Sequence, residues 1–220
     1  MTLVCCSCGG ARARPQLSAN EVAEANQAVL AQVASSETRV GAAFVVGADG
    51  LVVSALHLVE GQSNLRVRLR YDPVEYVVTS IAGLDKVHDL ALLRIEPHRA
   101  LPIARLGESS ALAVNDRVYD LGRGHVLDGT ISQIRRLSMA LTIVQIRTAN
   151  PREWSGPVFD THGDVVGIAV ASIPTGEVIA VPIEELKPML KHPMAMLPAD
   201  FAIETAPAPQ APAAAGTPPK

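Results

Sequence analysis

Three residues of this chain have the types and the order that nucleophilic catalysis by serine needs. Ser155 lies in a glycine-containing turn, His57 ends an apolar run, and Asp89 directly precedes another apolar run. A buried aspartate can fix the tautomer of an imidazole, and that imidazole can accept the proton of a serine hydroxyl. The order His, Asp, Ser is one of the known orders of such triads. The stretches that hold them are SALHLVEG from Ser54, HDLALLRI from His88 and NPREWSGPVFD from Asn150.

Each of the three residues also has an ordinary structural role. The chain contains 6 histidines, so His57 alone is as well explained by a hydrogen-bonded structural position. Asp89 alone is explained as a turn carboxylate, and Ser155 as a loop serine. The catalytic hypothesis therefore depends on whether the fold brings the three residues together.

The pattern around these residues is typical of an all-β protein. Short apolar runs are separated by Gly, Asp, Asn and Pro, a rhythm that favours a sandwich or barrel. Residues 55–61 predict a single helical turn closed by glycine, and this turn carries His57. The expected strands are residues 40–46, 51–54, 64–70, 75–81, 90–95, 117–121, 126–135, 141–147, 165–171 and 178–181.

Helices are expected at both ends of this β region. Ser18 can cap a helix with Glu21 reaching back, which is the spacing of a capping box. Apolar residues then recur at helical spacing from Val22 to Val33. A second helix is expected over residues 183–190, directly after a proline.

These patterns divide the chain into four parts. We expect a flexible cysteine-bearing N-terminus (1–17), a helix and linker (18–38), one β domain (39–192) and a disordered tail rich in Pro and Ala (193–220). The β domain has roughly 150 residues, which suffices for one ordinary domain or for two small barrels that share a core.

Composition excludes several classes of function. The net charge is −3 and aromatic residues make up 3% of the chain, which argues against a nucleic-acid surface with stacking platforms. No run of ~18 apolar residues occurs, so we expect no membrane span. Cys5, Cys6 and Cys8 lie together near the start without a histidine cluster, which predicts a flexible thiol-bearing end rather than a zinc site.

The region from about residue 40 to 190 resembles trypsin-like serine peptidases of the bacterial HtrA type. The resemblance implies an all-β fold of two six-stranded antiparallel β-barrels, with the active site in the cleft between them. His57 and Asp89 would come from the first barrel and Ser155 from the second. We expect no C-terminal PDZ domain of the kind that often follows in this family. The pieces that carry the resemblance are GAAFVVGADGLVVSALHLVEG, HDLALLRI, ARLGESSALAVNDRVYDLG, DGTISQI, WSGPVFDTHGDVVGIAV and GEVIAVPIEEL, in the family's order.

The resemblance also implies where a substrate would lie. The substrate-binding strand corresponds to residues 167–172, and the pocket wall draws on residues 176–181. Small side chains in this wall indicate a small apolar pocket. The residues assigned to the substrate pocket are Val170, Ala171, Ser172, Ile179 and Ala180.

The nucleophile loop departs from the family's pattern, which is glycine, any residue, serine, glycine, a small residue and proline. Counting back from Pro157 without a gap puts Trp154 at the nucleophile position. Counting forward from the strand entry at Val144 and Gln145 puts Ser155 there and deletes a glycine after it. Both alignments stay open. The loop here is Arg152-Glu153-Trp154-Ser155-Gly156-Pro157.

In either alignment the glycine two residues before the nucleophile is replaced, by Glu153 or by Arg152. The family uses the N–H of that glycine as half of its oxyanion hole, in a conformation that glycine adopts more easily than other residues. The loss of one such donor typically costs ~10²–10³ in rate. We therefore assign Glu153, Trp154 and Gly156 to the loop that decides catalysis.

We expect a serine endopeptidase that cleaves protein substrates, with Ser155 as nucleophile, His57 as general base and acid, and Asp89 as the orienting carboxylate. The altered oxyanion loop predicts weak activity. One alternative is an inactive protease fold that binds peptides or a partner protein, and another is a structural barrel in which His57 and Asp89 lie apart. No metal or organic cofactor is implied. The resemblance suggests an exported, periplasmic protein and a homo-oligomer, a trimer.

Overall fold

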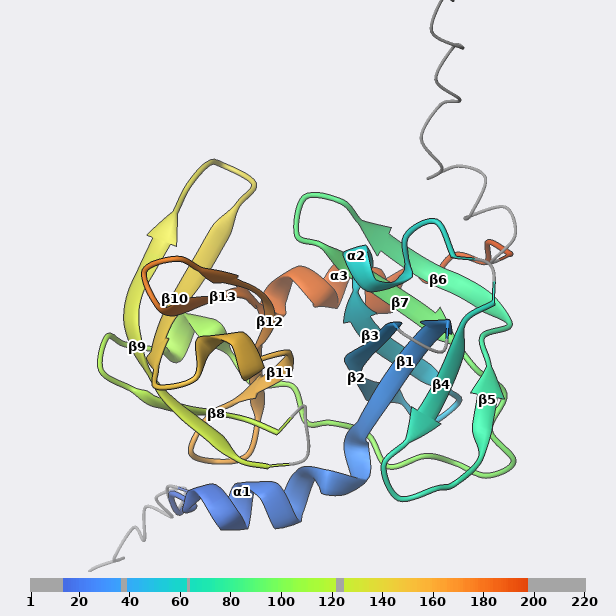
Figure 1. Cartoon of the computed structure of the whole chain (residues 1–220), viewed down its shortest axis with the longest axis horizontal. Coiled ribbons are helices and arrows are strands. Elements are labelled where there is room, and N and C mark those ends of the chain that lie inside the picture. The colour runs from blue at the N-terminus through green and yellow to red at the C-terminus, as the bar shows by residue number, and fades with distance from the viewer. Residues whose placement is uncertain (1–13, 37–38, 63, 122–124, 198–220) are drawn as a thin grey trace, which may run out of the picture.

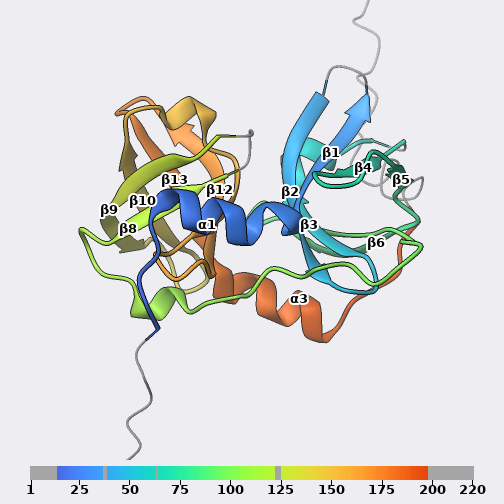
Figure 2. The same ribbon diagram turned by 90° about the horizontal axis from the view of Figure 1, so that it is seen from below.

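The computed structural model describes residues 14–36, 39–62, 64–121 and 125–197. Two β-rich halves lie side by side, and a helix crosses between them on one face (Figures 1 and 2). No helix in these ranges is long and apolar enough to cross a membrane. The expected flexible cysteines and most of the expected Pro- and Ala-rich tail lie outside the described residues.

The helix α1 spans Ala19–Asn26 and begins at the predicted capping box. The hydroxyl oxygen of Ser18 accepts the amide of Glu21, and the Glu21 carboxylate accepts the amide of Ser18 at 2.7 Å. The Ser18 hydroxyl also donates to this carboxylate at 2.7 Å, and the bonds from the Ser18 hydroxyl and amide hold the pKa of the Glu21 carboxyl below its ordinary value. Val22 of α1 is fully buried and belongs to an apolar cluster with residues of both β halves. This burial holds α1 against the two halves.

The helix is shorter than the sequence pattern predicted, because the chain becomes extended within the stretch that we expected to be helix and linker. A 3₁₀ turn, η1, follows at Gln27–Val29, and strand β1 begins at Leu30 and ends at Ser36. Ala31 and Val33 are buried while Gln32 between them is exposed, an alternation of period two. The apolar residues fit both periods, and pairing of β1 with two strands decides in favour of the strand.

The first half is a seven-stranded antiparallel sheet with the order β5-β4-β1-β2-β3-β7-β6. The sequence pattern merged β5 and β6 into one strand. They are separate because the chain changes partners there: the amide of Val78 donates to Leu65, and that of Thr79 to Arg94. Besides β1, the strands are β2 Arg39–Gly47, β3 Leu51–Ala55, β4 Arg66–Leu69, β5 Glu75–Val77, β6 Ser80–Asp85 and β7 Leu90–Arg94.

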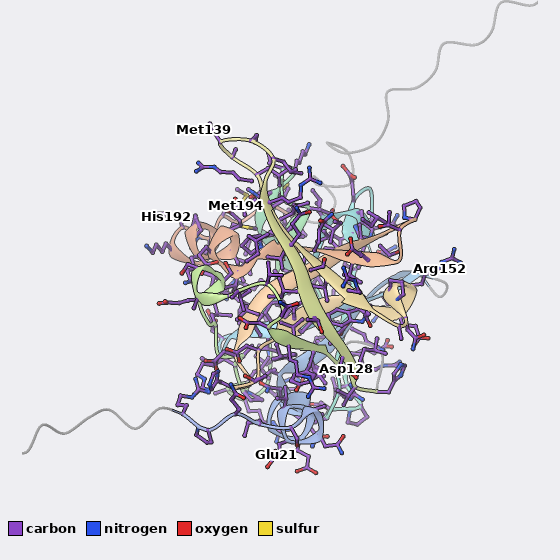
Figure 3. The ribbon with its side chains drawn as sticks, turned by 90° about the vertical axis from the view of Figure 1, so that its left-hand side faces the viewer. Glu21, Asp128, Met139, Arg152, His192 and Met194 are labelled. Carbon is purple, nitrogen blue, oxygen red and sulfur yellow. The ribbon has the colours of Figure 1, made fainter. Side chains whose placement is uncertain are left out.

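The second half is a closed six-stranded barrel with the order β10-β13-β12-β11-β8-β9. The sequence pattern missed β11, because its Gly-Pro start is a turn signal, yet it pairs with both β12 and β8. Figure 3 shows β9 running from near Asp128 toward the hairpin tip at Met139. The strands are β8 Arg117–Asp120, β9 Leu127–Arg136, β10 Thr142–Thr148, β11 Gly156–Phe159, β12 Val165–Ile173 and β13 Glu177–Pro182.

A shared apolar core joins the two halves. Phe44 and Leu92 of the first half belong to the same buried cluster as Phe159 and Ile168 of the second. The expected C-terminal helix forms as a 3₁₀ turn, η4 (Ile183–Leu186), and a helix, α3 (Lys187–Lys191), and its first residues join this cluster. The two halves are therefore held together by a continuous apolar core.

The fold is mostly β, but it differs from the two six-stranded barrels that the resemblance implied. The described residues form one closed barrel and one seven-stranded sheet whose edge strands are β5 and β6. The sheet is larger than expected because β1, predicted as the end of the N-terminal helix and linker, is inserted between β2 and β4.

Candidate active site

His57 lies on α2, a single helical turn at Leu56–Val59 that follows β3 directly. The amide of Leu56 donates to the backbone oxygen of Asp89 at 2.9 Å. The amide of His57 donates to Oδ1 of Asp89 at 2.8 Å. The first amides of a helix have no partner within the helix, so Asp89 caps this turn and fixes the position of His57.

The ring of His57 also contacts Asp89. Nδ1 of His57 lies 2.5 Å from Oδ2 of Asp89, and the two side chains are 53% and 31% exposed. A carboxylate only accepts hydrogen bonds, so Nδ1 carries a proton. In the neutral ring Nε2 is then the basic nitrogen. This contact rules out the alternative in which His57 and Asp89 lie apart.

The backbone of Asp89 is in the left-handed region, with φ of 56°, which few residues other than glycine adopt. The preceding turn is held on several sides. Oδ1 of Asp85 accepts the amides of Val87 and His88. The ring of His88 contacts Oδ2 of Asp85 at 2.7 Å and the carbonyl oxygen of Ala140, from the β9–β10 hairpin, at 2.8 Å. These contacts maintain the strained conformation of Asp89.

The predicted nucleophile loop is a 3₁₀ turn, η3 (Pro151–Glu153), followed by Trp154, Ser155 and β11. Gly156 has φ of 86°, and a Cβ there would lie 2.8 Å from Cβ of Ala42 on β2. The loop therefore touches the first half at a position where only glycine fits. This close approach brings Ser155 to the boundary between the halves.

Trp154 and Ser155 face different surroundings. Trp154 is only 7% exposed, and its indole N–H donates to Oγ1 of Thr148 at 3.1 Å. Its side chain belongs to the apolar core of the second barrel. Ser155 is half-buried. The tryptophan side chain is thus largely buried in the barrel core.

A cavity of about 420 Å³ lies between the two halves and brings most of the predicted site residues together. The first half contributes His57, Ala42 and Leu58, and the second contributes Trp154, Ser155, Gly156, Val170, Ala171 and Ser172. Ile179 and Ala180, the other two residues that we assigned to the substrate pocket, do not line this cavity. They lie on β13, one strand further from the opening, and Ala180 is buried in the barrel core.

The amides expected to form an oxyanion hole already have acceptors. The Ser155 amide donates to Oδ2 of Asp120 at 2.6 Å, and Asp120 is fully buried. The Glu153 amide donates to the carbonyl oxygen of Asn150 at 3.1 Å. The Glu153 carboxylate contacts Nε2 of His125 at 2.7 Å. In this conformation these two amides are engaged by the protein itself.

Two residues of this region have roles that the sequence did not settle. We did not predict Asp120, although an acid inside the apolar strand VYDL signals a buried partner. Arg152, the other candidate for the lost glycine position, lies at the periphery of the barrel (Figure 3). Among the described residues, no group of three or more His, Cys, Asp or Glu side chains is placed to hold a metal ion.

Known proteins share this fold. The HtrA-type protease AlgW with a bound tripeptide has a TM-score of 0.68 and 24% identity, over 79% of this chain and 62% of that one. At this identity the likeness concerns the fold alone.

Sequence comparison gives the family. Residues 41–168, more than half of the chain, match the model of the trypsin-like peptidase domain. The mitochondrial serine protease HTRA2 of Bos taurus is 32% identical over 164 residues, covering 68% of this chain and 35% of that protein. The Do-like serine protease HtrA of Bacillus subtilis is 32% identical over 161 residues, covering 64% and 35%. The chain spans about 33–41% of the length of the curated relatives that it matches. The chain therefore belongs to the trypsin-like peptidase family and is related to the HtrA serine proteases.

Proposed function

We propose that the protein is a serine endopeptidase of the trypsin and HtrA type, acting on polypeptides. The observation that carries the proposal is that Ser155 and the Asp89-bound His57 line one cavity between the two halves. The withdrawal of Trp154 into the barrel supports Ser155 as the nucleophile. We also infer that the seven-stranded sheet takes the place of the family's first barrel.

In this assignment each residue has one task. Oγ of Ser155 bonds to the substrate carbonyl carbon while Nε2 of His57 takes its proton, and Asp89 stabilises the resulting imidazolium. His57 then gives that proton to the leaving amine as the peptide C–N bond breaks. A water molecule, deprotonated by His57, releases the acyl group from Ser155 and completes hydrolysis.

The strand next to the cavity is suited to a polypeptide. The pairing of β12 with β11 ends at Ala169, opposite Gly156. Ala171 and Ser172 lie beyond that point, are exposed and belong to the cavity wall. An extended peptide can add to such a strand edge through backbone hydrogen bonds, which would place its carbonyl groups beside Ser155.

Efficient hydrolysis requires a change in the nucleophile loop. The amides of Ser155 and Glu153 are bonded to Asp120 and Asn150, so neither is available to an oxyanion. Loss of one such donor typically costs ~10²–10³ in rate. We therefore infer low activity in the resting conformation and a rearrangement of residues 153–155 when substrate binds.

Labelling with a fluorophosphonate tests the proposal. The probe should modify Ser155, as located by peptide mass spectrometry. Ser155→Ala and His57→Ala should both abolish modification, because one removes the nucleophile and the other its base. Ser110→Ala changes an exposed serine outside the cavity and serves as the matched control. Modification that persists in His57→Ala at the original rate would contradict the proposal.

A second candidate is a cleft that binds peptides without cleaving them. The engagement of the Ser155 amide by Asp120 favours it, because that contact withdraws an oxyanion donor. This candidate predicts saturable peptide binding in the cavity with no labelling of the folded protein. Fluorophosphonate labelling of the unaltered chain therefore distinguishes the two functions.

A further inference from the structure

Trp154, the only tryptophan of the chain, lies between the cavity and the barrel core. It forms part of the cavity wall beside Ser155. It also belongs to the apolar cluster that contains Ala169 of β12 and Ala180 of β13. These two strands carry the residues that we expected to line a substrate pocket, so the indole packs in the region where that pocket was expected.

The barrel leaves a space that fits this indole, called the seat below, next to Gly129, Ile146 and Thr148. A Cβ at Gly129 of β9 would lie 2.9 Å from Cζ2 of Trp154 and 2.6 Å from Cγ2 of Ile146. Both distances are too short for a real side chain, so Gly129 leaves the space that the ring fills. Gly129 pairs with Thr148 of β10, and Thr148 is the residue that accepts the indole N–H.

The Thr148 hydroxyl fixes the direction of the indole. It donates to the backbone oxygen of Asp128 at 2.9 Å and accepts the indole N–H of Trp154 at 3.1 Å. A hydroxyl has one proton to donate, so its orientation is set by Asp128 and its lone pair faces Trp154. The tryptophan is therefore held by shape and by a directed hydrogen bond.

We infer that Trp154 is a specificity-determining residue. Its indole fills the apolar pocket beside Ser155 from the side of the barrel core, so the cavity accepts only peptides with a small side chain at the position next to Ser155. The identity of the ligand as a peptide rests on the proposed function. The cavity wall that includes Ser155 contains the small residues Ala42, Gly156 and Ala171 together with the larger Leu58 and Val170. On this inference a glycine or alanine residue of the peptide fits against the small residues of this wall, whereas a leucine or phenylalanine side chain needs the volume that the indole occupies.

Peptidyl diphenyl phosphonates test this inference, because the side chain beside phosphorus is defined by the probe. Probes with an alanine, leucine or phenylalanine side chain at that position should label the unaltered chain at different rates, alanine fastest by about 10-fold or more. In Trp154→Ala the leucine and phenylalanine probes should gain by a similar factor relative to the alanine probe. Trp154→Phe, which keeps an aromatic ring in the seat, should retain most of the original preference.

A second readout does not depend on turnover. A dry apolar cavity of about 150 Å³ can bind a benzene-sized molecule, so free indole should raise the thermal midpoint of Trp154→Ala in a concentration-dependent manner. It should not do so in the unaltered chain, where the seat is filled. If Trp154→Ala does not fold, Trp154→Leu provides the labelling measurement, because the smaller side chain opens part of the space that the indole fills.

The outcomes separate this inference from the proposed function. If both chains are labelled with the same order of preference, the inference is overturned while the peptidase proposal stands. If neither chain is labelled, the peptidase proposal fails, and the indole measurement decides whether Trp154 closes a pocket. A folded Trp154→Ala chain that indole does not stabilise would contradict the inference in either case.

Discussion

The backbone nitrogen of Ser155 lies 2.6 Å from Oδ2 of Asp120, a carboxylate with no exposed surface. Hydrogen bonds from an amide to a charged acceptor are stronger than those between neutral groups. Asp120 therefore takes the place, with respect to this N–H, that the oxyanion of a reacting substrate would take. The contact gives a physical reason for a nucleophile loop that is folded and yet poorly prepared for catalysis.

Asp120→Asn should raise the reactivity of Ser155. The substitution keeps the shape of the side chain but replaces one of the two carboxyl oxygens by an NH₂ group, which donates and does not accept, so the Ser155 amide can turn toward the cleft at lower cost. We expect the rate of fluorophosphonate labelling to rise on the order of 10-fold, a part of what one oxyanion donor contributes. Asp128→Asn, at an exposed position on β9, is the matched control. A folded Asp120→Asn chain with unchanged or slower labelling would count against this role.

Asp89→Asn should lower the reactivity of Ser155 without loss of the fold. Asparagine tolerates the left-handed backbone of this position and its oxygen can still accept the amide of His57. The ring of His57 would lose the carboxylate that fixes its tautomer, which costs about 10⁴ in rate in a well-characterised triad. Labelling kinetics and circular dichroism measure the two effects. A fall of less than about 10-fold would show that Asp89 does not act through His57.

Gly156→Ala should destabilise the chain for two separable reasons. The backbone φ of 86° strains any residue with a Cβ, and that Cβ would meet Ala42 at 2.8 Å. Backbone strain and overpacking each cost about 1–3 kcal/mol. Adding Ala42→Gly should restore only the part due to the contact. Urea unfolding of the unaltered chain, the two single variants and the double variant measures the coupling between the positions. If the changes in the free energy of unfolding are fully additive, the two positions do not touch.

The meeting of His57 and Asp89 was expected from the family resemblance, whereas the sequence pattern by itself marks only the element boundaries at which the two residues stand. His57 lies in the short stretch that ends at Gly61, and Asp89 directly precedes a run of four apolar residues. The contact of Ser155 with Asp120 could not be predicted, since its donor is a backbone amide and every residue except proline has one. Only the path of the chain decides which amide reaches the carboxylate.

Strand β1 and the direction of Trp154 show two further limits of the pattern. Val22 to Val33 satisfies a helical period, and the strand period is favoured only once β2 and β4 offer partners. The loop 152–157 fits two alignments in sequence. In the structure the space above Gly129 and the hydroxyl of Thr148 accommodate the indole, and neither is adjacent to Trp154 in the chain.

Glu184 of η4 should make a contribution to stability that depends on pH. Its Oε1 accepts the amide of Ser109 at 2.9 Å, and its Oε2 accepts the Ser109 hydroxyl. Burial by itself raises the pKa of Glu184, but the hydrogen bonds from Ser109 and the charge of Lys187 outweigh it, so the pKa lies below its ordinary value. A carboxyl with a lowered pKa in the folded state stabilises above its unfolded pKa of about 4.3, and this contribution is lost as pH falls through the folded pKa.

Ser109→Ala removes the hydroxyl donor, so the folded pKa of Glu184 should return toward its ordinary value. The variant should be less stable than the unaltered chain at pH 6, and the difference should shrink between about pH 4.5 and pH 3, where Glu184 becomes protonated in both chains. Urea midpoints at these three values measure the difference, in which the other carboxyls cancel. Ser110→Ala, at the exposed neighbouring position, should show no such trend. A difference that is constant over this range would mean that the hydroxyl stabilises η4 without interacting with the charge of Glu184.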